Sequence, residues 1–256
     1  MGSLLDIRIN KPRLALIDFE GTLFDTRAAV LHAMTRTLQH VGGFNPQSII
    51  KETVWHYVYG TDDIGEAFSR LLNTTGEPAT APHVPQEVWV AAYNAIYAAE
   101  ALPLIEPYPG AKQLLEALRR ERIPVVIFGS NKQQATIRDV LKGCDGMAEE
   151  LLTGGQLPLM IMADTPLRKV AVKPDPASYK DYGLDFFAEY PGLAGASHVL
   201  VVGDTEADIL YAKEIGAEAC WVKHGYGNEA ECLALAPHMV VENFGELEKK
   251  ISNRNC

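Results

Sequence analysis

The sequence has few cysteines, no long apolar run and no excess of positive charge. Its four cysteines form no CxxC pair and no cluster with histidine, which argues against a structural zinc site and against a disulfide framework. No stretch approaches the roughly 18 consecutive apolar residues of a membrane span, and the N-terminus lacks the apolar segment of a secretory signal. We therefore expect a cytoplasmic protein that has no membrane partner.

The charge balance is acidic. The 256 residues carry a net charge of -10, and the isoelectric point is near 5.2. Because nucleic-acid phosphates are bound by an excess of Lys and Arg, this balance argues against a nucleic-acid partner. With 47% hydrophobic residues, the chain can bury a full core, either as one large domain or as a domain with an inserted module.

Short apolar runs alternate with helical patterns along much of the chain. The runs lie at 14–18, 123–130, 157–164, 198–204 and 217–222. The helical patterns between them lie at 111–122, 133–141 and 206–215. Apolar runs of this length are typical of strands that are covered on both faces. Their alternation with helices predicts an α/β fold with a doubly wound parallel sheet, in which ligands collect at the carboxyl ends of the strands.

One segment, residues 25–107, departs from this alternation. Its amphipathic patterns are helical, and the clearest lie at 28–40, 63–72 and 86–101. A connection between a strand and a helix usually has only a few residues, so this segment is too long to be one. We expect a core domain formed by residues 1–24 and 108–256, into which residues 25–107 are inserted as a helical domain.

Polar residues follow the first two core strands. Asp18 begins the segment DFEGT, in which Gly21 permits a turn whose backbone N–H groups can face an anion. An ordinary turn is an equally good interpretation of this segment alone. Ser130 and Asn131 end the second strand, where a hydroxyl and a helix N-terminus can donate to phosphate oxygens. The alternative for these two residues is a simple helix N-cap.

Two further segments carry charge. Lys173 begins the stiff segment KPDP, and for this segment alone a surface lysine in a turn is the favoured interpretation. Asp204 and Asp208 lie at the end of the run VLVV and one helical turn later, in the segment GDTEAD. Paired carboxylates in this position suit Mg²⁺, which takes oxygen ligands. The alternative is that Asp204 caps the helix and that the acids stabilise its first turn.

Taken together, the four segments resemble the haloacid dehalogenase superfamily. They are the DxDGT-like segment from Asp18, the strand-end Ser130, the KPxP-like segment from Lys173, and GDTxxD from Gly203 to Asp208. Their order matches that of the family, and the resemblance spans nearly the whole chain. The helical insert resembles the cap domain of the phosphoglycolate phosphatase-like branch. The segments YPG at 108–110 and HGYG at 224–227 also resemble that branch.

The resemblance implies an Mg²⁺-dependent phosphatase that acts on a small phosphorylated metabolite. Asp18 would attack phosphorus and form an aspartyl-phosphate, which water then hydrolyses. Lys173 would neutralise charge on Asp18 and on the transferring group. The metal would be held by Asp18, the backbone carbonyl of Glu20 and Asp204, with Asp208 acting directly or through water. The implied phosphate contacts come from Gly21, Thr22, Ser130, Asn131 and Lys173.

Glu20 departs from the family pattern. The phosphatases of this family usually carry Asp two residues after the nucleophile, where it serves as general acid and then as general base. Glu keeps the carboxyl group and adds a methylene, which displaces the acid. General acid–base catalysis is typically worth about 10² to 10⁴ in rate, and it depends on geometry. We keep Glu20 as the candidate acid and base, and we keep phosphatase ahead of other activities.

Two other functions stay open. A phosphomutase of the same branch would pass the phosphoryl group from Asp18 to another hydroxyl instead of to water. A non-catalytic binding protein would carry Glu20 as the trace of a decayed acid site. Detection of free phosphate separates these functions. The sequence does not distinguish a monomer from a homodimer.

Several aromatic and histidine residues have plainer interpretations. We expect Tyr93 and Tyr97, at helical spacing, to lie in a core. Tyr59 is a candidate for substrate contact, but a core position is the favoured interpretation for it as well. We expect His198 and His238 to be structural.

Overall fold

The computed structural model divides the chain into two compact units. It describes residues 11–59, 63–74, 84–128, 134–144, 147, 173–177, 179 and 196–253. One unit comprises Met1–Phe24 and Pro107–Cys256, and the other comprises Asp25–Glu106. The predicted strand at 157–164, and the predicted site residues Ser130 and Asn131, lie outside the described residues.

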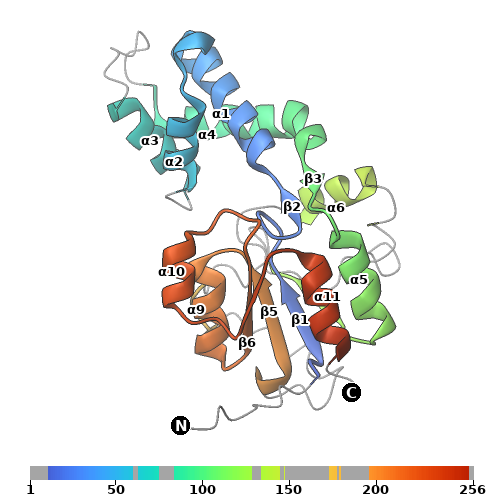
Figure 1. Cartoon of the computed structure of the whole chain (residues 1–256). Helices are drawn as coiled ribbons and strands as arrows, with labels where there is room; N and C mark the ends of the chain where they lie inside the picture. The colour runs from blue at the N-terminus through green and yellow to red at the C-terminus, as the bar shows by residue number, and fades with distance from the viewer. Residues whose placement is uncertain are drawn as a thin grey trace. The chain divides into compact units, whose positions relative to one another are not determined.

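The first unit is built on a parallel sheet. Its order is β4 (Val125–Ile127), β1 (Leu14–Ile17), β5 (Val199–Gly203), β6 (Glu218–Val222) and β7 (Met239–Val241). All neighbouring pairs are parallel, and Figure 1 shows helices on both sides of the sheet. The residues of β1 and β5 are buried throughout, as expected for strands covered on both faces. The predicted α/β fold with a doubly wound parallel sheet is confirmed.

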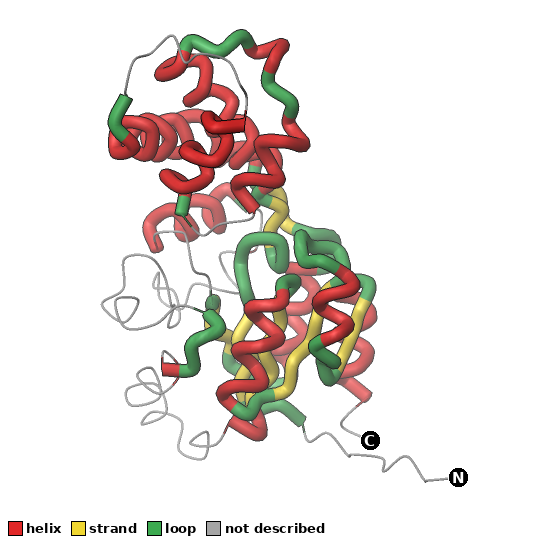
Figure 2. Tube along the Cα trace, turned by 90° about the vertical axis from the view of Figure 1, so that its left-hand side faces the viewer, coloured by secondary structure: helices red, strands yellow, loops and turns green. Residues whose placement is uncertain are grey.

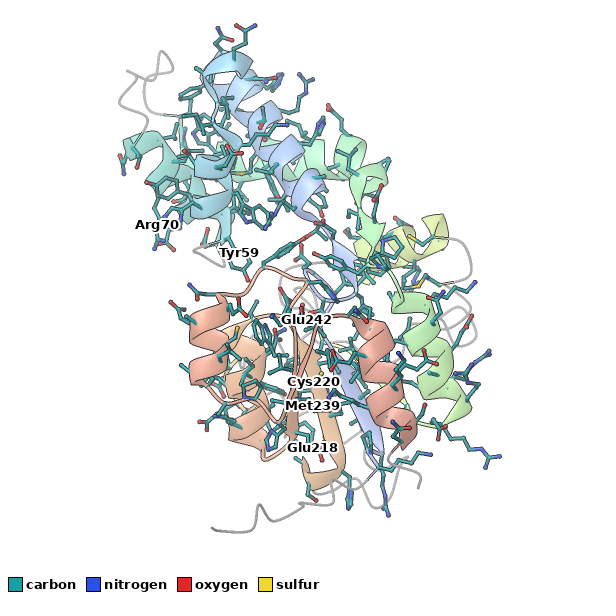
Figure 3. The ribbon with its side chains drawn as sticks, viewed as in Figure 1. Tyr59, Arg70, Glu218, Cys220, Met239 and Glu242 are labelled. Carbon is teal, nitrogen blue, oxygen red and sulfur yellow. The ribbon has the colours of Figure 1, made fainter. Side chains whose placement is uncertain are left out.

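The edge strand β7 was not among the predicted strands. Figure 3 labels Cys220 on β6 and Met239 on β7, which are direct partners in this parallel pair. Both side chains are buried, with 2% and 7% of their surface exposed. A run of three residues is too short for periodicity to identify it as a strand, so its assignment depends on its pairing with β6.

Helices cover both faces of the sheet. They are α5 (Ala111–Arg120), α9 (Glu206–Ile215), α10 (Glu229–Ala234) and α11 (Phe244–Ser252), and the same unit also contains α6 (Gln134–Gly143). In Figure 1, α9 and α10 lie on one side of the sheet and α5 and α11 on the other. The Asn243 side chain caps α11 by accepting from the Glu246 N–H, and Gly216 ends α9 in the left-handed conformation that glycine favours.

The second unit is helical. Its helices are α1 (Arg27–Gly42), α2 (Lys51–Tyr59), α3 (Ile64–Thr74) and α4 (Gln86–Ile96), which continues as a π-helical turn over Tyr97–Ala101. Short 3₁₀ turns lie at Pro46–Ser48 and Leu102–Leu104, and the tube in Figure 2 traces this succession of helices. A two-stranded sheet of β2 (Phe24–Asp25) and β3 (Glu106–Pro107) lies at the unit boundary in the sequence.

Aromatic side chains form the core of the helical unit. The Phe68 ring packs on Trp89, with centroids 5.2 Å apart, and on Tyr93 at 6.3 Å. Tyr93 and Tyr97 are 4% and 6% exposed, which confirms that they are core residues. Figure 3 labels Tyr59 on α2 and Arg70 on α3 at the periphery of this unit. No described helix is long and apolar enough to cross a membrane.

Candidate active site

Two neighbouring strands deliver the first two acidic residues. Asp18 follows β1, Asp204 follows β5, and the strands pair in register, with Ile17 opposite Val202. The Asp18 N–H donates to the Val202 carbonyl at 2.9 Å, which extends the ladder by one residue. The two side chains therefore leave the sheet at the same carboxyl edge.

Asp208 joins these two residues in one buried group. One carboxylate oxygen from each of Asp18, Asp204 and Asp208 lies within 4.8 Å of the others. The three residues are only 7%, 0% and 2% exposed. Carboxylates are rarely buried without compensation, because loss of hydration disfavours their charge. This burial marks the group as a candidate site.

Lys173 is the cation within the group. Its Nζ donates to Asp18 Oδ1 and to Asp208 Oδ1, both at 2.6 Å. The ammonium also lies 4.6 Å from the centre of the Phe128 ring, and the side chain is 8% exposed. The interpretation of Lys173 as a surface lysine is therefore wrong, because this side chain bridges two buried carboxylates from different elements.

Asp204 is held by hydrogen bonds on both carboxylate oxygens. The Thr22 hydroxyl donates to Oδ1 at 2.8 Å, and the backbone N–H of Tyr226 donates to Oδ2 at 2.7 Å. The Trp221 indole N–H donates to the Asp204 backbone carbonyl at 2.9 Å. These donors come from three different segments, so they hold Asp204 in one orientation.

Glycines make room around Asp204. Gly21 has a φ of 79°, which L side chains rarely adopt, and a Cβ there would overlap the Asp204 carboxylate. A Cβ on Gly225 would overlap both Asp204 and the Gly21 carbonyl. The close approach of these two backbone segments therefore requires glycine at both positions.

The N-terminus of α9 is capped by Thr205 together with Asp208, and not by Asp204. The Asp208 carboxylate accepts the Thr205 backbone N–H at 3.0 Å and the Thr205 hydroxyl at 2.7 Å. This is a capping box with Thr205 at the N-cap. The alternative interpretation of Asp204 as the cap is thus wrong, because its carboxylate is bonded to Thr22 and Tyr226 instead.

The first loop uses its polar groups within the protein. The Gly21 N–H donates to the Phe24 carbonyl at 2.9 Å, and the Thr22 hydroxyl donates to Asp204. The contact of Gly21 and Thr22 with phosphate stays a prediction. In the structure, the Gly21 N–H stabilises the loop, and the Thr22 hydroxyl orients Asp204. The Glu20 side chain is partly exposed and lies outside the group of three carboxylates.

Burial and mutual repulsion change the acidity of the group. Burial raises the pKa of Asp18 to about 7, with Asp208 and Glu20 adding to the rise and Lys173 opposing it. Burial also raises the pKa of Asp204 well above its ordinary value, and the charges of Asp18 and Asp208 act in the same direction. Burial alone would lower the pKa of Lys173, but Asp18 and Asp208 outweigh it and raise that pKa.

These residues fit a hard divalent cation. All three carboxylates offer oxygen ligands, as Mg²⁺ prefers, and Lys173 compensates only one of their three charges. The pKa values of Asp18 and Asp204 are raised because further negative charge is unfavourable in this buried group. A cation with two positive charges would balance the two charges that Lys173 does not compensate.

The acidity of this group predicts how pH affects the metal-free protein. Between pH 3.8 and about 7, folded Asp18 keeps a proton that the unfolded chain releases, and Asp204 acts in the same direction. The free energy of unfolding therefore falls as pH rises through this window, and it stays low above it. A loss of about 1 kcal/mol lowers Tm by about 2–4 °C in a chain of this size.

We expect the metal-free protein to melt at a lower temperature at pH 8 than at pH 6. Added Mg²⁺ should raise Tm more at pH 8, where it does not have to displace protons. Differential scanning calorimetry of the wild type and of Asp18→Asn measures both effects, because the variant lacks one of the two titrating carboxyl groups. An equal pH dependence in the two proteins would contradict this account.

Comparison with known proteins identifies the family. Residues 12–216 match the haloacid dehalogenase-like hydrolase family. The chain belongs to this family. The superfamily and the class of enzyme predicted from the four segments, a hydrolase of the haloacid dehalogenase superfamily, are thereby confirmed.

Individual relatives of this hydrolase agree with that assignment. The phosphoglycolate phosphatase of Pseudomonas fluorescens Pf-5 is 25% identical over 236 residues, which cover 92% of this chain and 78% of the relative. The crystal structure of a predicted phosphoglycolate phosphatase from Haemophilus somnus superposes with a TM-score of 0.73 at 20% identity, over 94% of this chain and 99% of that one. CbbY from Rhodobacter sphaeroides, solved in complex with phosphate, gives 0.69 at 16% identity, over 92% and 96%.

The structure of this hydrolase adds residues that carried no assigned role in the sequence. Tyr226 donates its backbone N–H to Asp204, and His224 Nε2 lies 2.9 Å from the Thr22 carbonyl. The His224 ring also packs against Tyr108 and Phe244, and burial lowers the pKa of this histidine. The signal for these contacts in the sequence was the segment HGYG. Its glycines indicate that the backbone packs closely there, but they do not identify the residues against which it packs.

Proposed function

We propose that this hydrolase is an Mg²⁺-dependent phosphatase that releases phosphate from a small phosphorylated metabolite through phosphorylated Asp18. The observation that carries the proposal is Lys173, whose ammonium bridges Asp18 and Asp208 within a buried group of three carboxylates. Support comes from the family, and from relatives that bear the name phosphoglycolate phosphatase. We take phosphoglycolate as the first substrate to test.

Mg²⁺ would be held by the carboxylates of Asp18, Asp204 and Asp208, together with the backbone carbonyl of Glu20. When bound, the ion supplies positive charge that offsets the carboxylates and the phosphoryl oxygens. Asp204 is pre-oriented for this task, because both of its oxygens already accept hydrogen bonds that keep the carboxylate in one position.

The first chemical step belongs to Asp18. Lys173 holds Oδ1, so Oδ2 would attack phosphorus in line as the bond between phosphorus and the ester oxygen breaks. Lys173 favours the ionised form of the nucleophile and would offset charge on the transferring group. Glu20 would give its carboxyl proton to the departing oxygen.

The second step regenerates the enzyme. The Glu20 carboxylate would take a proton from water, which attacks phosphorus, and the bond from phosphorus to Asp18 breaks. Phosphate leaves, and Asp18 is again a carboxylate. Ser130, Asn131, Gly21 and Thr22 are the proposed contacts of the phosphate oxygens.

The proposal also covers domain roles. Residues 25–107 would form a cap domain that selects the organic part of the substrate, and residues 1–24 and 108–256 would form the core domain. The protein would act in the cytoplasm as a monomer or homodimer.

A panel of phosphorylated metabolites tests this function. The purified protein is incubated with each compound and Mg²⁺, beginning with phosphoglycolate, and free phosphate is measured. Release of phosphate with turnover supports the proposal. An isomerised sugar phosphate without free phosphate would make the protein a mutase, and binding without conversion of any compound would make it a binding protein.

Glu20→Gln is expected to lower kcat by about 10² to 10⁴, because the amide keeps the length of the side chain but transfers no proton. Glu20→Asp should retain activity, since it restores the carboxyl group that relatives carry. Steady-state kinetics on an alkyl phosphate measure both effects. Glu214→Gln, at an exposed position on α9, is the matched control and should be silent.

The leaving group sharpens this test. p-Nitrophenolate departs without a proton, so the deficit of Glu20→Gln should shrink on p-nitrophenyl phosphate. If Glu20 contributes only its backbone carbonyl to the metal, the Glu20→Gln substitution would leave kcat nearly unchanged on both substrates. That result would remove Glu20 as the acid and base.

A further inference from the structure

A polar cavity lies at the edge of the core sheet opposite the candidate active site. It has a volume of about 500 Å³ and is lined by Lys11, Pro12, Arg13, Glu121, Arg122 and His198. Its residues precede β1, β4 and β5, whereas Asp18 and Asp204 follow β1 and β5. In Figure 3, Glu218, the first residue of β6, marks this amino edge of the sheet, and Glu242, which follows β7, marks the carboxyl edge.

Backbone pairing brings these distant residues together. The Arg13 N–H donates to the His198 carbonyl at 2.8 Å, at the start of the β1–β5 pair. The Ala15 N–H donates to the Pro124 carbonyl at 2.9 Å, which places the segment after α5 beside the same strand. The cavity is thus built on paired strands of the sheet.

The cavity is cationic in an acidic chain. Lys11, Arg13 and Arg122 face a single carboxylate, Glu121, which Lys11 already contacts at 2.6 Å. Among the described residues, neither arginine forms an ion pair with a carboxylate. Two guanidinium groups in one cavity are therefore left without a carboxylate partner from the described residues, although the chain as a whole carries a net charge of -10.

Arg122 occupies a backbone position at which glycine is the usual residue. The Arg122 N–H donates to the Arg119 carbonyl, and the Ile123 N–H donates to the Leu118 carbonyl, both at 2.9 Å. This is a Schellman motif at the end of α5, and Arg122 has a φ of 56°. An arginine in the left-handed conformation costs about 1 kcal/mol or more, so its presence here favours a role for the side chain.

His198 adds a polar atom without a partner. Its Nδ1 is buried and has no hydrogen-bond partner within the part of the chain that the structure describes. Burial of an unsatisfied polar atom is unfavourable and is explained when a ligand or water completes the bond. The expectation that His198 is only structural therefore leaves this atom unexplained.

We propose that this cavity binds a small oxyanion, a metabolite that carries phosphate or carboxylate groups, at a site separate from the catalytic one. Arginine presents a planar set of donors that matches both groups. The cavity volume lies in the range of about 300–1,000 Å³ that holds small molecules, so it accommodates more than one anionic group.

Isothermal titration of the full-length protein tests the site. Pyrophosphate and citrate are used as separate probes, which distinguish phosphate from carboxylate recognition. The first titrations use no added divalent metal, because the catalytic carboxylates then repel both probes. We expect binding by the wild type, and a Kd raised about tenfold or more in Arg122→Gly and in Arg13→Gln.

Arg122→Gly also separates binding from folding. Glycine suits the left-handed backbone, so Tm should stay equal or rise while binding is lost. Arg120→Gln is the matched control, because this substitution removes the same charge nearby. Arg120 pairs with Glu248 at 2.9 Å and does not line the cavity. Its Kd should stay within about twofold of the wild type.

Two results would overturn the site. One is the absence of binding of either probe to the wild type at millimolar concentration. The other is an equal loss of affinity in Arg120→Gln and Arg122→Gly, which would show a general effect of surface charge. Neither result depends on turnover, so the proposed phosphatase activity is tested separately.

Discussion

Asp18→Asn is expected to reduce the rate of phosphate release by at least about 10⁴-fold, to a level near that of buffer. The amide keeps the shape of the side chain but does not attack phosphorus, and loss of a nucleophile is among the largest effects of single substitutions in enzymes. The measurement is free phosphate at saturating substrate and Mg²⁺, with the wild type diluted until its rate is comparable.

The fold of this variant should be intact. The pKa of Asp18 is raised because its charge is disfavoured by burial and by its neighbours, so a neutral side chain removes repulsion. Tm of the metal-free variant should thus equal or exceed that of the wild type. Asp139→Asn, an exposed carboxylate on α6, is the matched control and should be fully active. Turnover within tenfold of the wild type would exclude Asp18 as the nucleophile.

Removal of divalent metal is expected to silence the enzyme completely. Without it, the ammonium of Lys173 is shared among the carboxylates of Asp18, Asp204 and Asp208, and the group lacks the positive charge that would hold an anionic substrate. Dialysis against EDTA, followed by gel filtration, should abolish phosphate release, and Mg²⁺ should restore it.

Two controls make the metal experiment decisive. EDTA saturated with Mg²⁺ beforehand should leave activity unchanged, which excludes direct inhibition by the chelator. Circular dichroism of the metal-free protein should match that of the loaded protein. Full activity in a preparation shown by elemental analysis to lack divalent metal would overturn the proposed cofactor.

The sequence predicted the strand-end acids because they depend on local pattern. Asp18 and Asp204 end apolar runs, and Asp208 follows Asp204 by one helical turn. Parallel strands place such residues at one edge. Lys173 could not be placed by the same reasoning, because its two partners lie 155 and 35 residues away. Its position had to come from the resemblance to a family, and the structure then supplied the contacts.

Other features of the structure could not be predicted from the sequence. β7 is too short to show periodicity. The anion cavity combines Arg13, Arg122 and His198, which are brought together only by strand pairing. The alternative that Asp204 caps α9 is wrong because Thr205 is the N-cap, and the sequence alone does not show which of these neighbouring polar residues begins the helix.

The hydrogen bond from the Trp221 indole to Asp204 gives this protein a built-in optical reporter. Of the three tryptophans, Trp55 and Trp89 belong to the helical unit, so Trp221 is the indole of the catalytic unit. Its N–H is bonded to the backbone carbonyl of Asp204, whose side chain is a proposed metal ligand. A change in charge at Asp204 should therefore alter the emission of a chromophore that the chain already carries, and occupancy of the site becomes visible in the unlabelled protein.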